Sequence, residues 1–211
     1  MLKRSFIKPF ALMVAALSSI LVGCASTELA PLQLQPPSLA PPTATLAMQR
    51  VRPQSARLVV LDQRPQHHAL RLHQGNKPAQ FATLKTPIAT LIRQQLLPYV
   101  RHQPDHALLL QLTVDQGLCI AEQTFTQHNM NCTFVLQVSA QVPNSSWTKT
   151  YTRTRSREGK LSLSNEYVQT DIVAVLNSAL SDFINDPEFY SWLNTYVPNA
   201  AHVIEEAANA F

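Results

Sequence analysis

Residues 132–142 read CTFVLQVSAQV, and this stretch decides the fold of the chain. Apolar side chains occupy every second position from Cys132 to Val142, and the residues between them are mostly polar. A period of two predicts a β-strand with one face in the core. The same alternation runs through residues 108–114, where Leu and Val hold the even positions. We therefore expect two neighbouring strands.

A third strand is expected at about 147–157, because the turn-forming sequence Pro143-Asn144-Ser145-Ser146 separates it from the second. The three strands would form an antiparallel meander. Shorter strands are expected upstream of this meander, at 57–62, 69–73 and 80–84.

Apolar residues at helical spacing predict helices around these strands. The first starts at Pro87 after an N-cap at Thr86 and runs to about residue 101, with Pro98 distorting its last turn. A long helix opens at Ser164, and a short one at Asp186-Pro187. The expected fold is α+β: a two-layer domain with a largely antiparallel, mixed sheet and two to three helices packed on one face.

The N-terminus has the layout of a bacterial secretory signal. Lys3, Arg4 and Lys8 precede an apolar run over residues 10–22. This run is shorter than the roughly 20 residues that a membrane-spanning helix needs. We expect residues 1–23 to be a cleaved signal peptide, and a membrane anchor helix is the alternative.

The segment Leu21-Val22-Gly23-Cys24 resembles a bacterial lipobox. The resemblance implies cleavage between Gly23 and Cys24, a diacylglyceryl group on the cysteine thiol, and a further acyl chain such as palmitate on its amino group. Acyl chains contribute about 0.8 kcal/mol per buried methylene, so three would hold the protein on a membrane. Ala25 stands where Asp would favour inner-membrane retention, which predicts an outer-membrane lipoprotein that faces the periplasm. No cofactor is expected besides this covalent lipid.

A proline-rich stretch follows the lipobox. Six prolines and no glycine occur between residues 31 and 53, which predicts that residues 24–55 are the lipidated cysteine and an extended tether. A proline-rich ligand for another domain is the alternative. The α+β domain is expected at 56–196, with a C-terminal tail or short helix at 197–211.

Charge argues against a nucleic-acid-binding protein. The formal net charge is +4, but three basic residues lie in the expected signal peptide, which leaves 14 basic against 13 acidic residues. Such a chain has no electrostatic footprint for DNA or RNA. The sequence also lacks a glycine-rich phosphate loop and the G-x-S-x-G and H-E-x-x-H motifs, so we expect no enzyme activity and no catalytic residues.

A basic ladder is the candidate for partner binding. Its members, which alternate with Thr and Ser, are Lys149, Tyr151, Arg153, Arg155 and Arg157. On a regular strand they would share one face, which would suit glycan phosphates, lipid headgroups or an acidic protein surface. The alternative, which we favour, is a solvated edge strand whose charges prevent aggregation.

In an oxidising periplasm Cys119 and Cys132 are candidates for a disulfide. Regular alternation places Cys119 on the face opposite the leucines of 108–114, whereas Cys132 shares the face of its apolar neighbours. A bulge at Gln116-Gly117 would reverse the register and allow the cysteines to pair. Both outcomes remain open.

Two polar clusters are weaker candidates for a binding site. His67, His68 and His73 suggest a zinc or copper site, but adjacent strand residues point to opposite faces, so we expect no metal. Asp62-Gln63-Arg64 ends a strand at a position where sheets often bind ligands. A local Asp–Arg pair that fixes the turn is the favoured interpretation.

With these features, the chain resembles the YajG-type lipoproteins of Gram-negative bacteria. The resemblance rests on the lipobox, the strand that ends in Leu61-Asp62-Gln63-Arg64, the helix–meander–helix order, the sequence Arg157-Glu158-Gly159, and the helix around 171–182. It implies a location and a fold, and it supplies no catalytic residues.

The expected function is therefore a non-enzymatic binding or envelope-maintenance module on the outer membrane, whose partner is an envelope protein or glycan. A regulator of a cell-wall synthase is the first alternative, although a flexible tether of about 30 residues averages only about 30 Å. A periplasmic metal- or ligand-binding protein is the second.

Overall fold

The computed structural model describes residues 32–35, 54–160 and 162–197, all of which belong to one compact unit. The expected signal peptide, Cys24 and residues 198–211 lie outside the described residues. The strands are β1 (Leu32–Leu34), β2 (Gln54–Asp62), β3 (His68–Gln74), β4 (Gln80–Leu84), β5 (Val100–His102), β6 (Leu109–Gln123), β7 (Gln127–Val142) and β8 (Ser145–Lys160). The helices are α2 (Ile88–Leu96), α3 (Asn165–Ile184) and α4 (Pro187–Tyr196).

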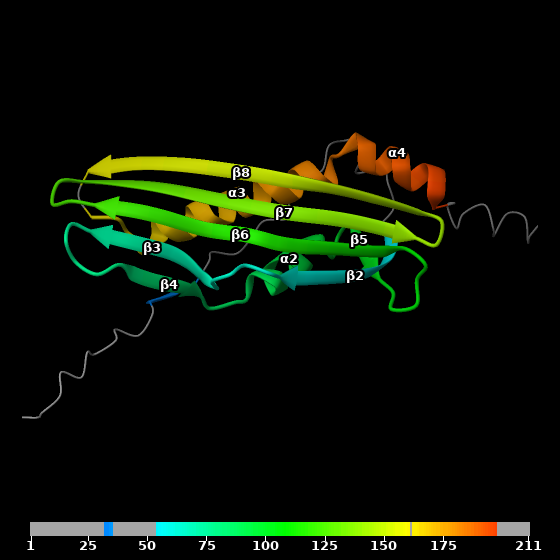
Figure 1. Cartoon of the computed structure of the whole chain (residues 1–211), viewed down its shortest axis with the longest axis horizontal. Helices are drawn as coiled ribbons and strands as arrows, with labels where there is room; N and C mark the ends of the chain where they lie inside the picture. The colour runs from blue at the N-terminus through cyan, green and yellow to red at the C-terminus, as the bar shows by residue number, and fades with distance from the viewer. Residues whose placement is uncertain (1–31, 36–53, 161, 198–211) are drawn as a thin grey trace, which may run out of the picture. The chain divides into compact units, whose positions relative to one another are not determined.

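The long strands β6, β7 and β8 form the antiparallel meander that the alternation predicts (Figure 1). On its other edge β6 is shared by two shorter strands, both parallel to it. β2 pairs with residues 109–114 and β3 with residues 119–123. β4 and then β1 extend the sheet beyond β3, and β5 pairs with β2. The mixed sheet curls into a half-barrel.

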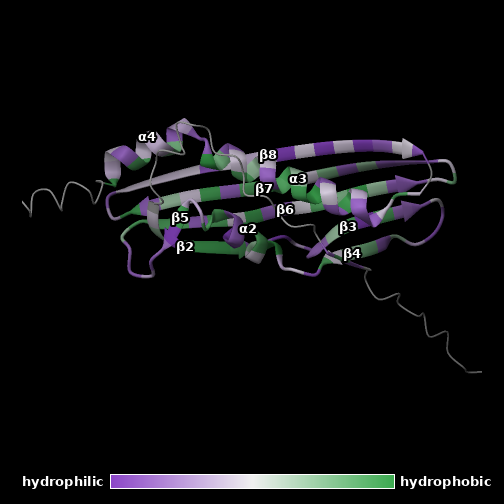
Figure 2. Ribbon diagram, turned by 180° about the vertical axis from the view of Figure 1, so that it is seen from behind, coloured by the Kyte–Doolittle hydropathy of each residue, from purple (hydrophilic) through white to green (hydrophobic). Residues whose placement is uncertain are grey.

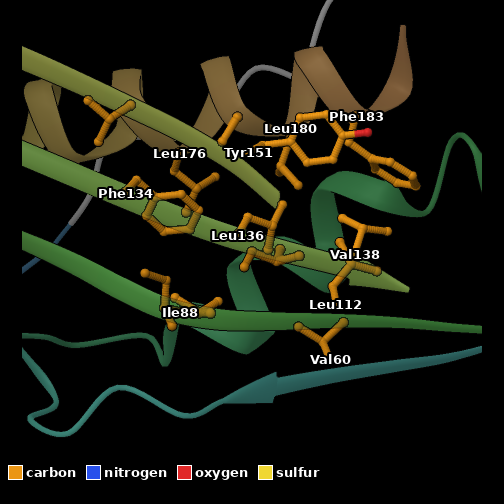
Figure 3. Packing of buried hydrophobic residues seen from close by; sticks show 14 of the residues in the cluster. Val60, Ile88, Leu112, Phe134, Leu136, Val138, Tyr151, Leu176, Leu180 and Phe183 are labelled. Carbon is orange, nitrogen blue, oxygen red and sulfur yellow. The ribbon is translucent and has the colours of Figure 1, made fainter. Parts of the chain in front are cut away.

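Helices cover one face of this sheet, as the view from behind shows (Figure 2). The even-numbered residues of β7 from His128 to Ala140 are buried toward the helices, whereas their odd-numbered neighbours face outward. Figure 3 shows Phe134 and Leu136 of β7 beneath Leu176 and Leu180 of α3. Burying side chains of this size contributes about 1.5–3 kcal/mol each. The two-layer α+β prediction is confirmed.

The first helix is shorter than the sequence indicated. α2 ends at Leu96 instead of continuing to about residue 101, and residues 100–102 form β5. Pro98 explains this difference, because proline has no backbone N–H to donate, so the helical hydrogen bonding cannot continue through it. Pro87 is the N-cap residue with no side-chain hydrogen bond, so the prediction that Thr86 caps the helix is wrong.

The later helix starts agree with the sequence. Ser164 caps α3 by accepting a hydrogen bond from the backbone N–H of Tyr167, and Asp186 caps α4 by accepting from Glu188 and Phe189. Within the described residues, no helix is long and apolar enough to span a membrane.

The boundary of the domain differs from the expected tether at 24–55. β1 lies inside that range and pairs in parallel with β4, and the backbone N–H of Lys85 donates to the carbonyl of Leu34 at 2.9 Å. The side chain of Leu34 is fully buried. Three residues are too few for alternation to be recognised, and the edge of β4 supplies the hydrogen bonds that stabilise them.

Candidate functional site

The basic ladder of β8 lies on the helix-covered side of the strand, and its members are held by acidic residues of α3 and α4. Arg153 forms an ion pair with Asp182. Arg155 and Arg157 both bind Asp171, whose side chain is fully buried, with shortest nitrogen–oxygen distances of 2.7 and 2.6 Å. The guanidinium group of Arg157 also lies over the ring of Tyr167, 4.7 Å from its centroid.

Asp186 joins the ladder to the start of α4. Its carboxylate accepts hydrogen bonds from the Tyr151 hydroxyl at 2.6 Å and from the backbone N–H of Glu188 at 2.8 Å, and it pairs with Lys149 at 2.9 Å. Burial by itself raises the pKa of Asp186, but the hydrogen bonds from Lys149 and Tyr151 outweigh it, so its pKa lies below the ordinary value. Burial, and then Asp186, raise the pKa of Tyr151.

Hydrogen bonds with these carboxylates also act on the basic groups. Asp186, followed by Glu188, raises the pKa of Lys149. Asp182 raises the pKa of Arg153, and Asp171 raises that of Arg157. The ladder therefore stays charged and paired within the domain.

The ladder is thus not a free basic surface for an acidic partner, because its charges are neutralised by the domain's own helices. The solvated-strand alternative describes the opposite face better, since Thr150, Thr152, Thr154 and Ser156 are exposed there. The prediction that this strand lies at the edge of the sheet is confirmed, because among the described strands β8 pairs only with β7.

The acidic partners were missed in the sequence, although their spacing carries a signal. Asp171 and Asp182 are eleven residues apart, which is about three helical turns and returns to the same face. The spacing covers about 16 Å along a helix, close to the roughly 13 Å from Arg153 to Arg157 along a strand. A matched acidic helix and basic strand are typical of two elements that pack together.

A polar groove of about 520 Å³ runs beside the free edge of β8. Residues 149–153 along the edge of β8, which include Lys149 and Arg153 of the ladder, form one wall, and Ser181 and Asn185 at the end of α3 contribute to the other. The groove contains both hydrogen-bonding side chains and the edge of a strand. It therefore has the chemistry to hold an extended polar segment.

Cys119 and Cys132 form a disulfide. The sheet register shifts between Val114 and Gln116, so Cys119 turns to the same face as Cys132 and the two residues are direct neighbours. This is the arrangement that a bulge near Gln116-Gly117 would permit. The bond ties two adjacent strands together inside the core.

Arg64 fills the interruption between β2 and β3. Its Nε and Nη2 atoms donate to the two carboxylate oxygens of Asp62 at 2.8 Å, and its Nη1 donates to the carbonyl of Gly117 at 3.0 Å. That carbonyl lies on β6 between the segments that pair with β2 and β3. Burial by itself raises the pKa of Asp62, but the hydrogen bonds and charge of Arg64 lower it by more. The pKa therefore lies below its ordinary value, and the carboxylate is charged. This is the local Asp–Arg pair that the sequence favoured.

The histidines do not converge. His67 is exposed, with its Nδ1 atom 3.3 Å from Asp62, whereas the ring of His68 lies 4.6 Å from the ring of Phe81. Burial, followed by the charges of Arg64 and Arg71, lowers the pKa of His68. In the described part of the chain, no three His, Cys, Asp or Glu side chains are grouped to hold a metal ion.

Comparison with known proteins gives a family and no activity. No curated protein matches the chain. A crystal structure of a DUF330 protein from Xanthomonas campestris is similar at a TM-score of 0.48 and 12% identity, over 77% of this chain and 98% of that one. Another uncharacterised structure is similar at a TM-score of 0.37 and 10% identity, over 74% and 99%.

The family comparison covers most of the chain. The model of a family described as "Uncharacterized lipoprotein" matches residues 41–194, from before β2 into α4. The chain therefore belongs to this family of uncharacterised lipoproteins, the YajG family.

Proposed function

We propose that this lipoprotein is anchored in the outer membrane through acyl chains on Cys24, and that its domain is a periplasmic binding module without enzyme activity. The lipobox at Leu21-Val22-Gly23-Cys24 and the residue Ala25 support the anchor and its location. The disulfide between Cys119 and Cys132 supports an oxidising compartment.

The ion pairs support a binding role over catalysis. Each of the carboxylates Asp62, Asp171 and Asp186 forms an ion pair with a basic side chain. A general acid or base needs a proton that it can exchange near neutral pH. The lowered pKa values of Asp62 and Asp186 make these carboxylates poor at that task.

The groove beside β8 is the observation that carries the binding role. An open strand edge offers unpaired N–H and C=O groups, and an extended peptide can add to it as a further strand. The ion pairs to α3 and α4 hold the inner side of β8 in place, and paired side chains such as Arg153 and Asp182 also line the groove. We assign this groove to an extended segment of an envelope protein.

Site-specific photo-cross-linking in cells tests the binding role. A photoreactive phenylalanine analogue at Thr152, in the groove, should give one defined adduct, whereas the same analogue at exposed Asn129 on β7 should give none. Adding Ser181→Trp, which fills the groove, should abolish the adduct. Equal adducts from both positions, or an adduct that survives Ser181→Trp, would contradict the assignment.

Fractionation tests the location separately. Ala25→Asp should move the protein from the outer-membrane to the inner-membrane fraction of a density gradient, and Ala25→Ser is the matched control that should stay. A wild-type protein already in the inner-membrane fraction would contradict the outer-membrane part of the proposal.

A further inference from the structure

One end of the sheet carries an aromatic side chain that the fold does not use. We call it the tip end; it consists of the β3–β4 turn at residues 75–79 and the β6–β7 turn at residues 124–126. The two turns lie at the same end because β3 runs parallel to β6 and Gln74 pairs with Gln123. Phe125 projects from the second turn with its side chain fully exposed. Insertion of this ring into a lipid interface would remove its apolar area from water, which is favourable.

The β6–β7 turn that carries Phe125 is well held. Thr124 and Gln127 exchange backbone and side-chain hydrogen bonds: the N–H of Thr124 donates to the carbonyl of Gln127 at 2.8 Å, and the N–H of Gln127 donates to the Thr124 hydroxyl at 3.2 Å. The position of Phe125 outside the sheet is therefore fixed by its neighbours.

The direction of β1 relates this end to the lipid anchor. β1 is parallel to β4, and β4 runs away from the tip end because it is antiparallel to β3. Leu32 is consequently the residue of β1 nearest the tip end. The register places Leu32 beside Ala82, which lies beside Leu70 and so level with Cys119.

The length of chain before β1 limits which part of the domain can approach the membrane. Seven residues separate Cys24 from Leu32, and the eight Cα–Cα steps between them reach at most about 29 Å. Phe125 lies six residues beyond Cys119 along the strand direction, about 20 Å away. Leu109, at the other end of β6, lies ten residues back, about 33 Å away. The anchor can reach past the tip end but not past the opposite end.

The charges at the tip end indicate what kind of surface it fits. Lys77 and Lys160 lie there with Glu122 and Glu158, and Glu166 at the start of α3 adds a third acidic side chain, so the end is close to neutral. A nearly neutral, polar end with one projecting aromatic ring matches a zwitterionic phospholipid interface, where aromatic residues are favoured.

We propose that the tip end rests on the phospholipid leaflet that holds the acyl chains of Cys24, with Phe125 inserted at the interface. This inference rests on the proposed lipid anchor, but it can be tested without cellular acylation. Cys119 and Cys132 are joined to each other, which leaves Cys24 as the single free thiol of residues 24–211. Coupling that thiol to a maleimide phospholipid in phosphatidylcholine vesicles reproduces the anchor chemically.

The test is quenching of tryptophan fluorescence by brominated phosphatidylcholine in those vesicles. Phe125→Trp should lose emission in brominated relative to unbrominated vesicles. The matched control is Leu97→Trp, because Leu97 is also exposed and lies three residues before Val100, which pairs with Gln54 at the opposite end. Its emission should not change beyond the background from Trp147 and Trp192.

Two results would overturn the inference. The first is emission from the Phe125→Trp variant that is quenched no more than emission from the Leu97→Trp variant. The second is stronger quenching of a Phe81→Trp variant, whose substituted side chain lies on the open sheet face. Neither result bears on the proposed acylation of Cys24, because labelling in cells tests that proposal separately.

Discussion

Arg64 shows how one side chain completes an interrupted sheet. Two short strands share one edge of β6, and the gap between them leaves the carbonyl of Gly117 without a neighbouring strand on that edge. Arg64 donates to that carbonyl while Asp62 binds the rest of its guanidinium group. A planar group with donors on several sides is needed for both contacts, and only arginine provides it.

Replacing Arg64 should therefore be costly. Arg64→Ala leaves the Asp62 carboxylate and the Gly117 carbonyl without their donor, and we expect the free energy of unfolding to fall by about 3–5 kcal/mol. Arg71→Ala, at an exposed site on β3, should change it by about 0.5 kcal/mol or less. Urea denaturation measures both variants, and equal losses would refute the role of Arg64.

Gly159 has a second local role, since the buried ring of His128 lies against it. A Cβ atom at position 159 would lie 2.5 Å from Cε1 of His128. Gly159→Ala should destabilise the domain by about 1–3 kcal/mol because the ring must shift within a packed core. The loss should shrink when His128→Ala is added, which a double-mutant cycle by urea denaturation measures. An undiminished loss would show that the contact is not its cause.

At the scale of elements, the pairing of β8 with α3 and α4 is the main structural device. The carboxylate of Asp186 is central to it, with a pKa below its ordinary value of 3.8. A carboxylate with a lowered native pKa stabilises the fold fully above its unfolded-state pKa, and this contribution is lost as pH falls through the native pKa.

This predicts the pH dependence of an Asp186→Asn variant. The variant should be less stable than wild type at pH 7. The difference should shrink as pH falls below about 3.8, because the unfolded chain then binds a proton at Asp186 before the native carboxylate does. Unfolding free energies measured between pH 7 and pH 3 test this. Asp105→Asn, at an exposed loop site, is the control and should track wild type. A constant difference for Asp186→Asn would contradict the assignment.

Long helices and strands, in which the apolar pattern repeats several times, are predicted from the sequence better than short ones. The alternation in β7 and the caps at Ser164 and Asp186 were sufficient to place the meander and the last two helices. β1 and β5 have three residues each and depend on neighbours far along the chain. The acidic partners of the ladder could be inferred only by matching helix spacing to strand spacing, because alternation alone does not say what covers a face.

At the scale of the whole molecule, the disulfide links β6 and β7, two neighbouring strands of the meander. Cys119 and Cys132 close a loop of 13 residues, for which the loss of chain entropy in the unfolded state corresponds to about 3 kcal/mol. Cys119→Ala with Cys132→Ala should therefore lower the urea midpoint. Adding reductant should lower the wild-type midpoint similarly and leave the double variant unchanged. A reductant effect on the double variant would contradict this origin.

The position of β1 also changes how far the domain can move. A free tether between Cys24 and β2 would have 29 residues, but pairing of β1 with β4 leaves seven between the cysteine and the sheet. A short connection suits a module that works close to its membrane. It makes a regulator that must reach far across the periplasm a poorer interpretation.

Labelling with radioactive palmitate tests the central claim most directly. Wild-type protein should incorporate the label, whereas Cys24→Ser should incorporate none, because the thiol that accepts the diacylglyceryl group is gone and cleavage and acylation depend on it. Label in Cys24→Ser, or no label in wild type, would contradict a lipid anchor at Cys24.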